Sequence, residues 1–215
     1  MIAPSLLSAN FADLRSEMEW FNRSQADWLH LDIMDGIFVP NISFGFPVLK
    51  FVAKLCTKPL DVHLMIVDPW RFIPEVKALG TYMMNVHYEA CPDNLPGVIR
   101  DIHAAGMKAG VTIKPDTPVS VLSDIITQVD MVLLMGVHPG FGGQKFIPTT
   151  MDKLAQLRQL ISETGSKALI EIDGGVNMNN AQDILQAGAD ILVAGNAIFG
   201  APDPIEACAR MCALH

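Results

Sequence analysis

A short apolar segment, a loop and an amphipathic helical segment follow one another eight times along this chain of 215 residues. This alternation predicts a parallel sheet whose strands are joined by helices. The expected strands are Ile2–Leu6, Trp28–Met34, Leu60–Met65, Tyr82–His87, Lys108–Ile113, Met131–Met135, Ala168–Ile172 and Ile191–Ala194. The expected helices are Phe11–Asn22, Pro47–Leu55, Pro69–Ala78, Leu95–Ala105, Val119–Ile126, Thr149–Glu163, Asn179–Ala187 and Pro204–Cys212. Because no linker divides the eight units, we expect a single (β/α)8 TIM barrel domain over residues 1–215.

A doubly wound open sheet is the alternative architecture for such a repeat. It needs fewer strands, and it predicts a glycine-rich fingerprint after the first strand, where this chain has Pro4-Ser5-Leu6-Leu7. Two helix starts, Asp68-Pro69 and Asp203-Pro204, resemble an N-cap followed by proline at the first helical position. Helices are expected to end at Gly80, Gly106 and Gly188.

Composition narrows the class of partner. Half of the residues are hydrophobic and only 18% are charged, which suits a protein with a sizeable core. The net charge of −8 argues against nucleic acid or an anionic membrane as the main partner, although backbone amides can still bind an anionic small substrate. The chain has no basic signal segment and no apolar run of membrane-spanning length, so we expect a cytoplasmic protein with no membrane partner. Its four cysteines lack CxxC spacing and are expected to be free thiols.

Polar side chains gather where the expected strands end, which is where a barrel carries its chemistry. In Trp28–Met34, side chains two residues apart share a face, so His30, Asp32 and Met34 point opposite to the apolar residues between them. The other strand-end residues are Ser5, His63, Met65, His87, Met135, Asp173, Gly195 and Asn196.

Two imidazoles and two carboxylates are expected to converge from three of these strand ends: His30, Asp32, His63 and Asp173. This mixed nitrogen and oxygen set predicts one divalent ion per chain, with Zn²⁺, Fe²⁺, Mn²⁺ or Co²⁺ favoured over Ca²⁺ or Mg²⁺. A hydrogen-bonded core histidine is the usual explanation for a single strand histidine. We keep that explanation for His87 and His138, leaving support of a ligand or contact with substrate open for both.

Glycines follow three consecutive strands and can bring backbone amides close to a phosphate. They lie in Gly140-Phe141-Gly142-Gly143, in Asp173-Gly174-Gly175 and at Gly195. Tight turns alone would also explain each of them. Three methionines, Met34, Met65 and Met135, are expected to line the same pocket, either as plain wall or as polarizable contacts to a delocalised anion.

Taken together, these segments resemble the ribulose-phosphate 3-epimerase family over essentially the whole chain. The stretches that carry the resemblance are Ile2–Ala9, His30-Leu31-Asp32-Ile33-Met34-Asp35-Gly36, Asp61-Val62-His63-Leu64-Met65, Pro139–Gln144, Asp173-Gly174-Gly175 and Val193-Ala194-Gly195. The resemblance implies metal ligation by His30, Asp32, His63 and Asp173. It implies contact with a small phosphorylated ketose through Ser5, His63, Gly140, Phe141, Gly142, Gly143, Asp173, Gly174, Gly175 and Gly195, and we add Asn196, which follows Gly195. It also implies a homo-oligomer of the pentose phosphate pathway.

The implied reaction interconverts D-ribulose 5-phosphate and D-xylulose 5-phosphate by removing the C3 proton and returning one to the opposite face of a cis-enediolate. Asp32 and Asp173 are the expected acid and base. Two positions depart from the family pattern: His138 replaces the usual Asn and Asn196 the usual Ser. The alternatives are therefore an allulose-6-phosphate 3-epimerase, which acts on a ketohexose phosphate, and a non-catalytic phosphosugar-binding barrel. The presence of both aspartates disfavours the last.

Overall fold

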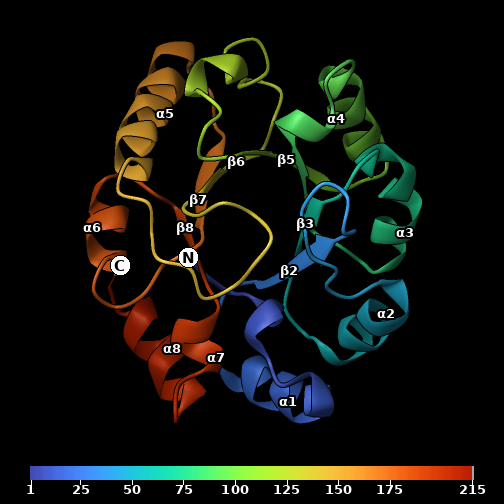
Figure 1. Ribbon diagram of the computed structural model, residues 1–215, viewed down its shortest axis with the longest axis vertical. Helices are drawn as coiled ribbons and strands as arrows, with labels where there is room; N and C mark the ends of the chain where they lie inside the picture. Colours follow the sequence, from blue (N-terminus) through green and yellow to red (C-terminus); the bar gives the residue numbers. More distant parts are fainter. Residues whose placement is uncertain (215) are drawn as a thin grey trace.

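A computed structural model describes residues 1–214. Its eight strands are β1 (Ile2–Pro4), β2 (Leu29–Met34), β3 (Leu60–Met65), β4 (Met83–His87), β5 (Lys108–Ile113), β6 (Met131–Met135), β7 (Leu169–Asp173) and β8 (Ile191–Ala194). The helices are α1 (Leu14–Arg23), α2 (Phe46–Leu55), α3 (Ile73–Ala78), α4 (Leu95–Ala104), α5 (Thr150–Thr164), α6 (Ala181–Gln186), α7 (Asn196–Phe199) and α8 (Pro204–Cys212). All strand pairs are parallel, and the helices form a ring around them (Figure 1).

The strands form one sheet in the order β1-β8-β7-β6-β5-β4-β3-β2, and its two edges meet. The meeting point is a bridge between Ser5 and His30, together with a hydrogen bond from the Asp27 amide to the Ile2 carbonyl oxygen (2.9 Å). The TIM barrel prediction is therefore confirmed, and the doubly wound open sheet is wrong. The strands of this sheet are buried on both faces, one facing the barrel interior and the other covered by helices.

Alternation in β2 divides its side chains between the two sides of the barrel wall. Leu29 and Leu31 are fully buried in the layer between strands and helices. His30 and Asp32 point the other way, into the barrel interior, where they are equally buried. The division is the one that the spacing of apolar residues predicted.

One expected helix does not form. In place of Val119–Ile126 the structure has a 3-10 turn, Val119–Leu122, followed by further turns, so no α-helix covers the barrel between α4 and α5 (Figure 1). The segment still buries the apolar residues Val119, Leu122, Ile125 and Ile126, but through successive turns rather than a regular helix. Ser123 also bonds back to the Ser120 carbonyl oxygen and competes with regular helical bonding.

Helix ends follow the sequence signals with one exception. The Asp203 carboxylate accepts the Glu206 amide (3.0 Å) and caps α8 as expected. Asp68 instead adopts a left-handed backbone (φ 49°) and its side chain makes no cap, so the N-cap expectation there is wrong. Gly80, Gly106 and Gly188 all follow helices with positive φ, as expected.

At the base of the barrel, one aspartate motif occurs three times. The Asp27 amide donates to the Ile2 carbonyl oxygen, and the Asp27 carboxylate accepts the Ile2 amide (2.7 Å). The same two-way contact joins Asp130 to Ala109 (2.9 Å) and Asp190 to Ile170 (2.8 Å). Each aspartate lies one or two residues before a strand and contacts the strand that precedes it in the sequence. The three contacts therefore join β2 to β1, β6 to β5 and β8 to β7. We call these contacts the basal latches.

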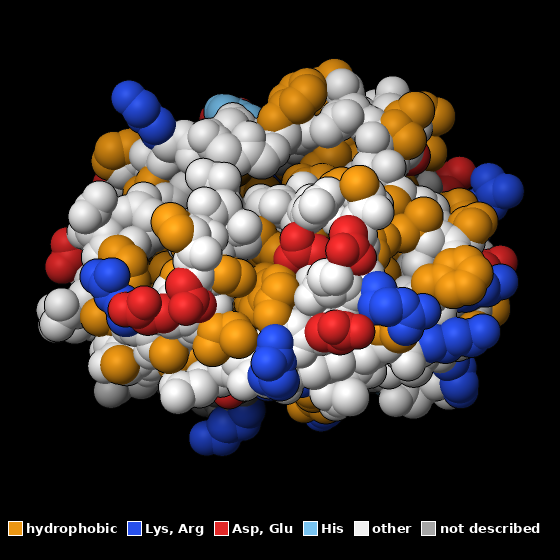
Figure 2. Space-filling view, turned by 90° about the horizontal axis from the view of Figure 1, so that it is seen from below, with side chains coloured by type: hydrophobic (Ala, Val, Ile, Leu, Met, Phe, Trp, Pro, Cys, Tyr) orange, Lys and Arg blue, Asp and Glu red, His pale blue; other side chains and the backbone are white. Residues whose placement is uncertain are grey.

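On the face of the molecule shown in Figure 2, acidic and basic side chains do not separate into patches of one sign. Around α1, at the lower side of the barrel in Figure 1, acidic and basic side chains are interspersed among apolar ones (Figure 2). No helix within residues 1–214 has the length and apolar character needed to cross a lipid bilayer. The four cysteines are free thiols, as expected, and two of them, Cys91 and Cys208, are buried.

Candidate active site

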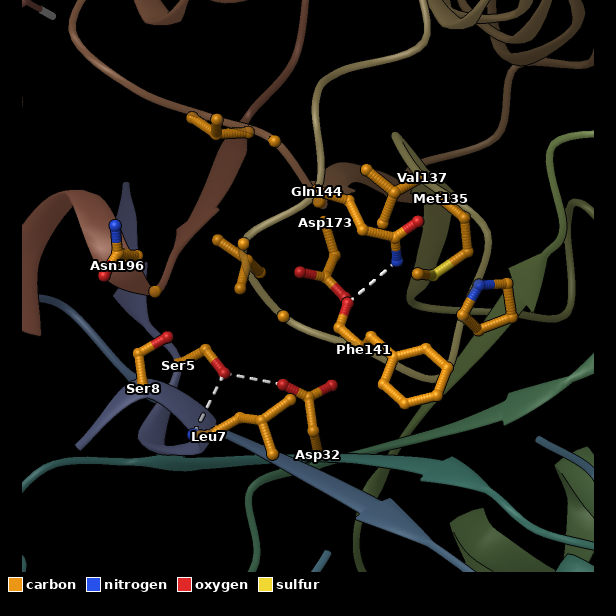
Figure 3. Close-up of a pocket in the computed structure, with 18 of the residues that line it drawn as sticks. Ser5, Leu7, Ser8, Asp32, Met135, Val137, Phe141, Gln144, Asp173 and Asn196 are labelled. Carbon is orange, nitrogen blue, oxygen red and sulfur yellow. Dashed lines mark hydrogen bonds between the residues drawn. The ribbon is translucent and has the colours of Figure 1, made fainter. Parts of the chain in front are cut away.

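A cavity of about 250 Å³ opens at the carboxyl ends of the strands (Figure 3). Most of the residues that the sequence assigned to substrate or pocket wall line it: Ser5, Asp32, Met34, Met65, Met135, Gly140, Phe141, Gly142, Gly143, Asp173, Gly174, Gly175, Gly195 and Asn196. His30 and His63 do not line the cavity, since both are fully buried in the barrel interior. The site therefore has an open upper part and a polar layer buried below it.

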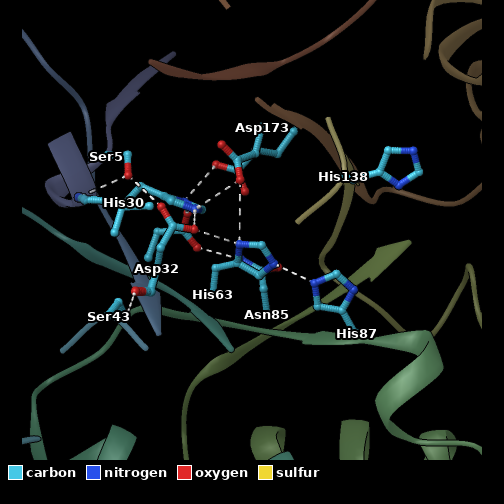
Figure 4. Close-up of polar contacts among 12 residues, drawn as sticks. Ser5, His30, Asp32, Ser43, His63, Asn85, His87, His138 and Asp173 are labelled. Carbon is cyan, nitrogen blue, oxygen red and sulfur yellow. Dashed lines mark hydrogen bonds and ion pairs between the residues drawn. The ribbon is translucent and has the colours of Figure 1, made fainter. Parts of the chain in front are cut away.

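The four residues expected to bind a metal come together in that layer (Figure 4). One nitrogen or oxygen from each lies within 4.8 Å of the others. His30 Nε2 is 3.3 Å from an Asp32 oxygen and 3.9 Å from an Asp173 oxygen, and His63 Nδ1 is 3.0 and 3.7 Å from the same two oxygens. Two nitrogens and two carboxylates around one point form a donor set suited to a single divalent ion.

The orientation of His30 fits such an ion. Its Nδ1 lies 2.5 Å from an oxygen of Asp61, a buried carboxylate that also accepts the Asn85 amide nitrogen (2.6 Å). Its Nε2 is buried and has no hydrogen-bond partner among the described residues, while it faces Asp32 and Asp173. A histidine held by a carboxylate through one nitrogen and bare at the other is the arrangement seen in histidine metal ligands.

Sequence reasoning missed two acidic residues of this layer. Neither Asp61 nor Glu171 is among the metal ligands that the sequence predicts. Each shares strand parity with a predicted ligand, Asp61 with His63 and Glu171 with Asp173, and that signal would have found them. Both Glu171 oxygens are buried without a hydrogen-bond partner among residues 1–214, and Oε1 lies 3.9 Å from His30 Nδ1. Burial and the charge of Asp61 raise the pKa of Glu171 well above its usual range, so it is neutral.

On its other side His63 contacts His87, which in turn contacts Glu89. The distances are 2.9 Å from His63 Nε2 to His87 Nε2 and 3.2 Å from His87 Nδ1 to Glu89 Oε2. Burial lowers the pKa of His87 to about 4, against the opposing hydrogen bond from Glu89. Burial alone would raise the pKa of Glu89, but hydrogen bonds from His87, Thr117 and the Lys114 amide lower it to about 2. His87 is therefore neutral and Glu89 is a carboxylate.

The two candidate catalytic aspartates differ in proton affinity. Burial by itself raises the pKa of Asp32, but the charge and hydrogen bond of His30, with the hydrogen bond of His63, outweigh it and hold that pKa far below its usual range. Burial, reinforced by the charge of Asp32, raises the pKa of Asp173 to about 6. Ser5 Oγ also donates to Asp32 Oδ2 (2.6 Å; Figure 3). Asp32 is thus ionised and fixed, whereas Asp173 holds a proton more readily.

Ser43, in the loop after β2, completes the end of that strand. Its Oγ donates to the Asp32 carbonyl oxygen (2.7 Å) and accepts the Met34 amide (3.0 Å). These two backbone groups point toward β1, which has already ended at Pro4. A side-chain hydroxyl therefore replaces the missing strand and holds the segment that carries Asp32. Nothing in the sequence identifies this role, because Ser43 lies in an irregular loop.

Glycines in the loops after β7 and β8 stand at positions where a side chain would not fit. Gly175 has φ +72°, and a Cβ there would lie 2.4 Å from the Phe146 amide nitrogen. A Cβ on Gly195 would lie 2.5 Å from Ser8 Oγ. Gly175 therefore packs against the Phe146 backbone and Gly195 against the Ser8 side chain, and both glycines also line the cavity.

The loop after β6 overhangs the cavity. Gln144 Nε2 donates to the carbonyl oxygens of His138 and Phe141 (2.8 Å each), which holds the loop in shape. The Phe141 ring is 55% exposed at the rim. His138 does not line the cavity; its ring is exposed and lies 3.8 Å from the Asp116 carboxylate. Gln144 and Ser8 are lining residues that the sequence reasoning did not single out.

Comparison with known proteins identifies what the chain resembles. The model of the family described as "Ribulose-phosphate 3 epimerase family" matches residues 1–199. Proteins named ribulose-phosphate 3-epimerase from Mycobacterium bovis and Bacillus subtilis are each 45% identical over 211 residues, which covers 98% of this chain and 91% and 97% of those proteins. A solved 3-hexulose-6-phosphate synthase from Salmonella typhimurium has a TM-score of 0.74 at 17% identity, covers 99% of this chain and 97% of its own, and shows likeness of fold alone.

Proposed function

Because the chain belongs to the ribulose-phosphate 3-epimerase family, we propose that it interconverts D-ribulose 5-phosphate and D-xylulose 5-phosphate by inverting C3. The observation that carries this proposal is the pair of carboxylates, Asp32 and Asp173. They reach one point from β2 and β7, on different sides of the barrel, and both line the cavity. Inversion at carbon needs a proton acceptor and a proton donor on opposite faces of a planar intermediate, and two such groups supply them.

The roles of the two aspartates follow from their proton affinities. Asp32 is ionised and receives the C3 proton of D-ribulose 5-phosphate, while Ser5 and His63 hold its oxygens in place. Asp173, with its pKa raised to about 6, delivers a proton to the other face. In the reverse direction the two groups exchange roles. The intermediate between the two transfers is the cis-enediolate of the sugar.

His30, Asp32, His63 and Asp173 would hold one divalent ion, and the mixed nitrogen and oxygen donors favour Zn²⁺ among Zn²⁺, Fe²⁺, Mn²⁺ and Co²⁺. Such an ion supplies positive charge that stabilises the negative charge developing on the substrate oxygens. Support for the site comes from the bare, buried His30 Nε2 and from its carboxylate-bound Nδ1.

The substrate phosphate is proposed to bind backbone amides of the loops after β6, β7 and β8. These loops contribute Gly140–Gly143, Gly174–Gly175 and Gly195–Asn196 to one wall of the cavity. The sugar would then extend toward Asp32 and Asp173, past Met34, Met65 and Met135, which are buried and line the same cavity. Because a phosphate anchored this way supplies binding energy remote from C3, unphosphorylated D-ribulose should react poorly.

Three finer expectations rest on the family resemblance. We propose that residues 1–215 act as one catalytic domain, that the chain assembles as a homo-oligomer, and that it serves the pentose phosphate pathway in the cytoplasm. Light scattering on the purified protein would test the assembly directly.

The test of the proposed function is solvent exchange at C3 in aspartate variants. Asp32→Asn and Asp173→Asn should each reduce epimerisation by about 10²–10⁴-fold, the range for loss of a general acid or base. In variants shown by elemental analysis to retain their ion, Asp173→Asn should still exchange the C3 proton of D-ribulose 5-phosphate with D2O. Asp32→Asn should exchange only the xylulose epimer. Asp116→Asn, whose carboxylate is exposed at the rim, is the control and should be unaffected.

Equal exchange of both epimers in either variant would indicate a single mobile base and would contradict these roles. Absence of any epimerisation by the wild-type protein loaded with Zn²⁺, Fe²⁺, Mn²⁺ or Co²⁺ would contradict the proposed function itself.

A further inference from the structure

We propose that His87 and Glu89 are positioning residues that keep a proton on Nε2 of His63, so that His63 Nδ1 is available to a metal ion. The inference rests on the proposed function, because it concerns a ligand of the proposed metal site. It does not concern substrate contact: neither His87 nor Glu89 lines the cavity. Figure 4 shows His63 and His87 side by side, with His87 on the side away from Asp173.

Glu89 is an ionised carboxylate and can therefore only accept hydrogen bonds. Its Oε1 accepts the Lys114 amide (2.8 Å) and the Thr117 hydroxyl. Its Oε2 lies 3.2 Å from His87 Nδ1. A carboxylate has no proton to donate, so the contact with His87 requires the proton on His87 Nδ1.

The proton on His87 Nδ1 decides what its other nitrogen does. In a neutral imidazole with a proton on Nδ1, Nε2 carries a lone pair and accepts. That Nε2 lies 2.9 Å from His63 Nε2, and the ring centroids are 5.0 Å apart with their planes inclined by 27°. Because the centroids are much farther apart than the two nitrogens, the rings meet at their nitrogen edges. His63 Nε2 must therefore be the donor.

Asp32 opposes this arrangement, which is why His63 needs support. Its oxygen lies 3.0 Å from His63 Nδ1 and, acting alone, would attract the proton of a neutral His63 to Nδ1. A proton at that nitrogen would block ligation. The contact with His87 holds the proton at the opposite nitrogen. At His30 a single carboxylate, Asp61, does the equivalent work directly, whereas at His63 the carboxylate of Glu89 acts through a second imidazole.

We call the contacts that run from Glu89 through His87 to His63 the relay. Burial prevents water from taking the place of its members. The His87 ring is fully buried, and the Phe38 ring covers it at 4.8 Å between centroids. Only Glu89 reaches toward solvent, with a side chain that is 21% exposed. A change at Glu89 therefore acts on His63 across the whole relay, although the two residues do not touch.

The first test reads the tautomers directly in the metal-free wild-type protein. Histidine side chains labelled with ¹⁵N report by two-bond correlation spectra which ring nitrogen carries hydrogen. We expect His87 to carry its proton on Nδ1 and His63 to carry one on Nε2. A proton on His87 Nε2 would overturn the inference, whatever the activity of the enzyme.

The second test measures Zn²⁺ affinity by competition with a chromophoric chelator. In Glu89→Gln the amide cannot accept from every donor that the carboxylate serves, and in His87→Phe the acceptor for His63 is lost. Both should bind Zn²⁺ about 10–100-fold more weakly, the effect typical of losing a group that orients a metal ligand. His87→Gln should restore most of the affinity, because its amide oxygen can accept from His63 while its nitrogen donates to Glu89.

Matched controls come from the exposed pair at the rim, His138 and Asp116. Asp116→Asn and His138→Gln make the same chemical changes without touching the relay and should leave Zn²⁺ affinity unchanged. Wild-type affinity in Glu89→Gln would overturn the inference even if the enzyme is an epimerase. Conversely, a wild-type protein that shows the expected tautomers and binds Zn²⁺ but does not epimerise would contradict only the proposed function.

Discussion

The loop residue Ser43 offers a sharp test of how the end of β2 is held. Ser43→Ala removes one hydroxyl that donates to the Asp32 carbonyl oxygen at 2.7 Å and accepts the Met34 amide at 3.0 Å. The matched control is Ser166→Ala. The Ser166 hydroxyl, before β7 at the opposite end of the barrel, makes the same pair of backbone contacts, to the Ile126 carbonyl oxygen (2.6 Å) and the Ala168 amide (3.2 Å).

The two substitutions should cost the fold similar free energy. Each removes two hydrogen bonds and leaves a backbone carbonyl and a backbone amide without their partner, and an unpaired amide costs about 1–3 kcal/mol when it is buried. We expect the free energy of unfolding to fall by about 2–3 kcal/mol in both variants, measured by urea denaturation.

Activity should separate the two variants. Only Ser43→Ala releases the segment that carries Asp32, and a displacement of about 1 Å at a reacting group can lower the rate by about 10²-fold. We therefore expect kcat to fall by about tenfold to 10²-fold in Ser43→Ala and to stay near the wild-type value in Ser166→Ala. Ser43→Thr, which keeps the hydroxyl, should restore kcat. Equal kcat values in the two alanine variants would refute the reasoning.

Three further results are expected. Exhaustive chelation should abolish activity, and one divalent ion per chain, counted by elemental analysis, should restore it; full activity in metal-free protein would contradict the metal site. Burial and the charge of Asp32 raise the pKa of Asp173 to about 6, and the charges of Asp32 and Asp61, against the effect of burial, raise the pKa of His30 well above its usual range. Protons therefore compete with the ion at both ligands, and calorimetric affinity for Zn²⁺ should fall by at least about tenfold per pH unit from pH 6 to pH 5; an affinity independent of pH in this range would contradict these ligands. Gly175→Ala would place a Cβ 2.4 Å from the Phe146 amide nitrogen, so KM for D-ribulose 5-phosphate should rise while metal content is unchanged; an unaltered KM would place the phosphate elsewhere.

The architecture and the convergence of the four candidate metal ligands were predictable because both depend on periodicity. Eight repeats of one pattern leave few folds, and strand parity alone brings His30, Asp32 and His63 to one side of the wall. Glu171 has the same strand parity as Asp173. A charged residue inside a buried strand is unfavourable, and the sequence does not show that burial keeps the Glu171 carboxyl group protonated.

The remaining features depend on contacts between distant segments. Ser43 acquires its role only because β1 ends early and leaves two backbone groups of β2 without a strand partner. His87 has no sequence signal as a support for His63, since the pairing of β3 with β4 is what brings the two rings together. The turns after Val119 show the limit of periodicity itself, because a spacing of three and a spacing of 3.6 differ little over one short segment.

The basal latches bear on the order in which the barrel assembles. They join residues 25, 21 and 20 positions apart, so each closes a short loop between two consecutive strands at a small entropic cost. The seam between β1 and β8 joins opposite ends of the chain and carries the largest such cost. Strand pairs, rather than the complete barrel, are thus the natural folding modules. A circular permutant opened between β4 and β5 keeps the Asp130 latch within one continuous segment, whereas one opened between β5 and β6 makes that latch span the whole chain.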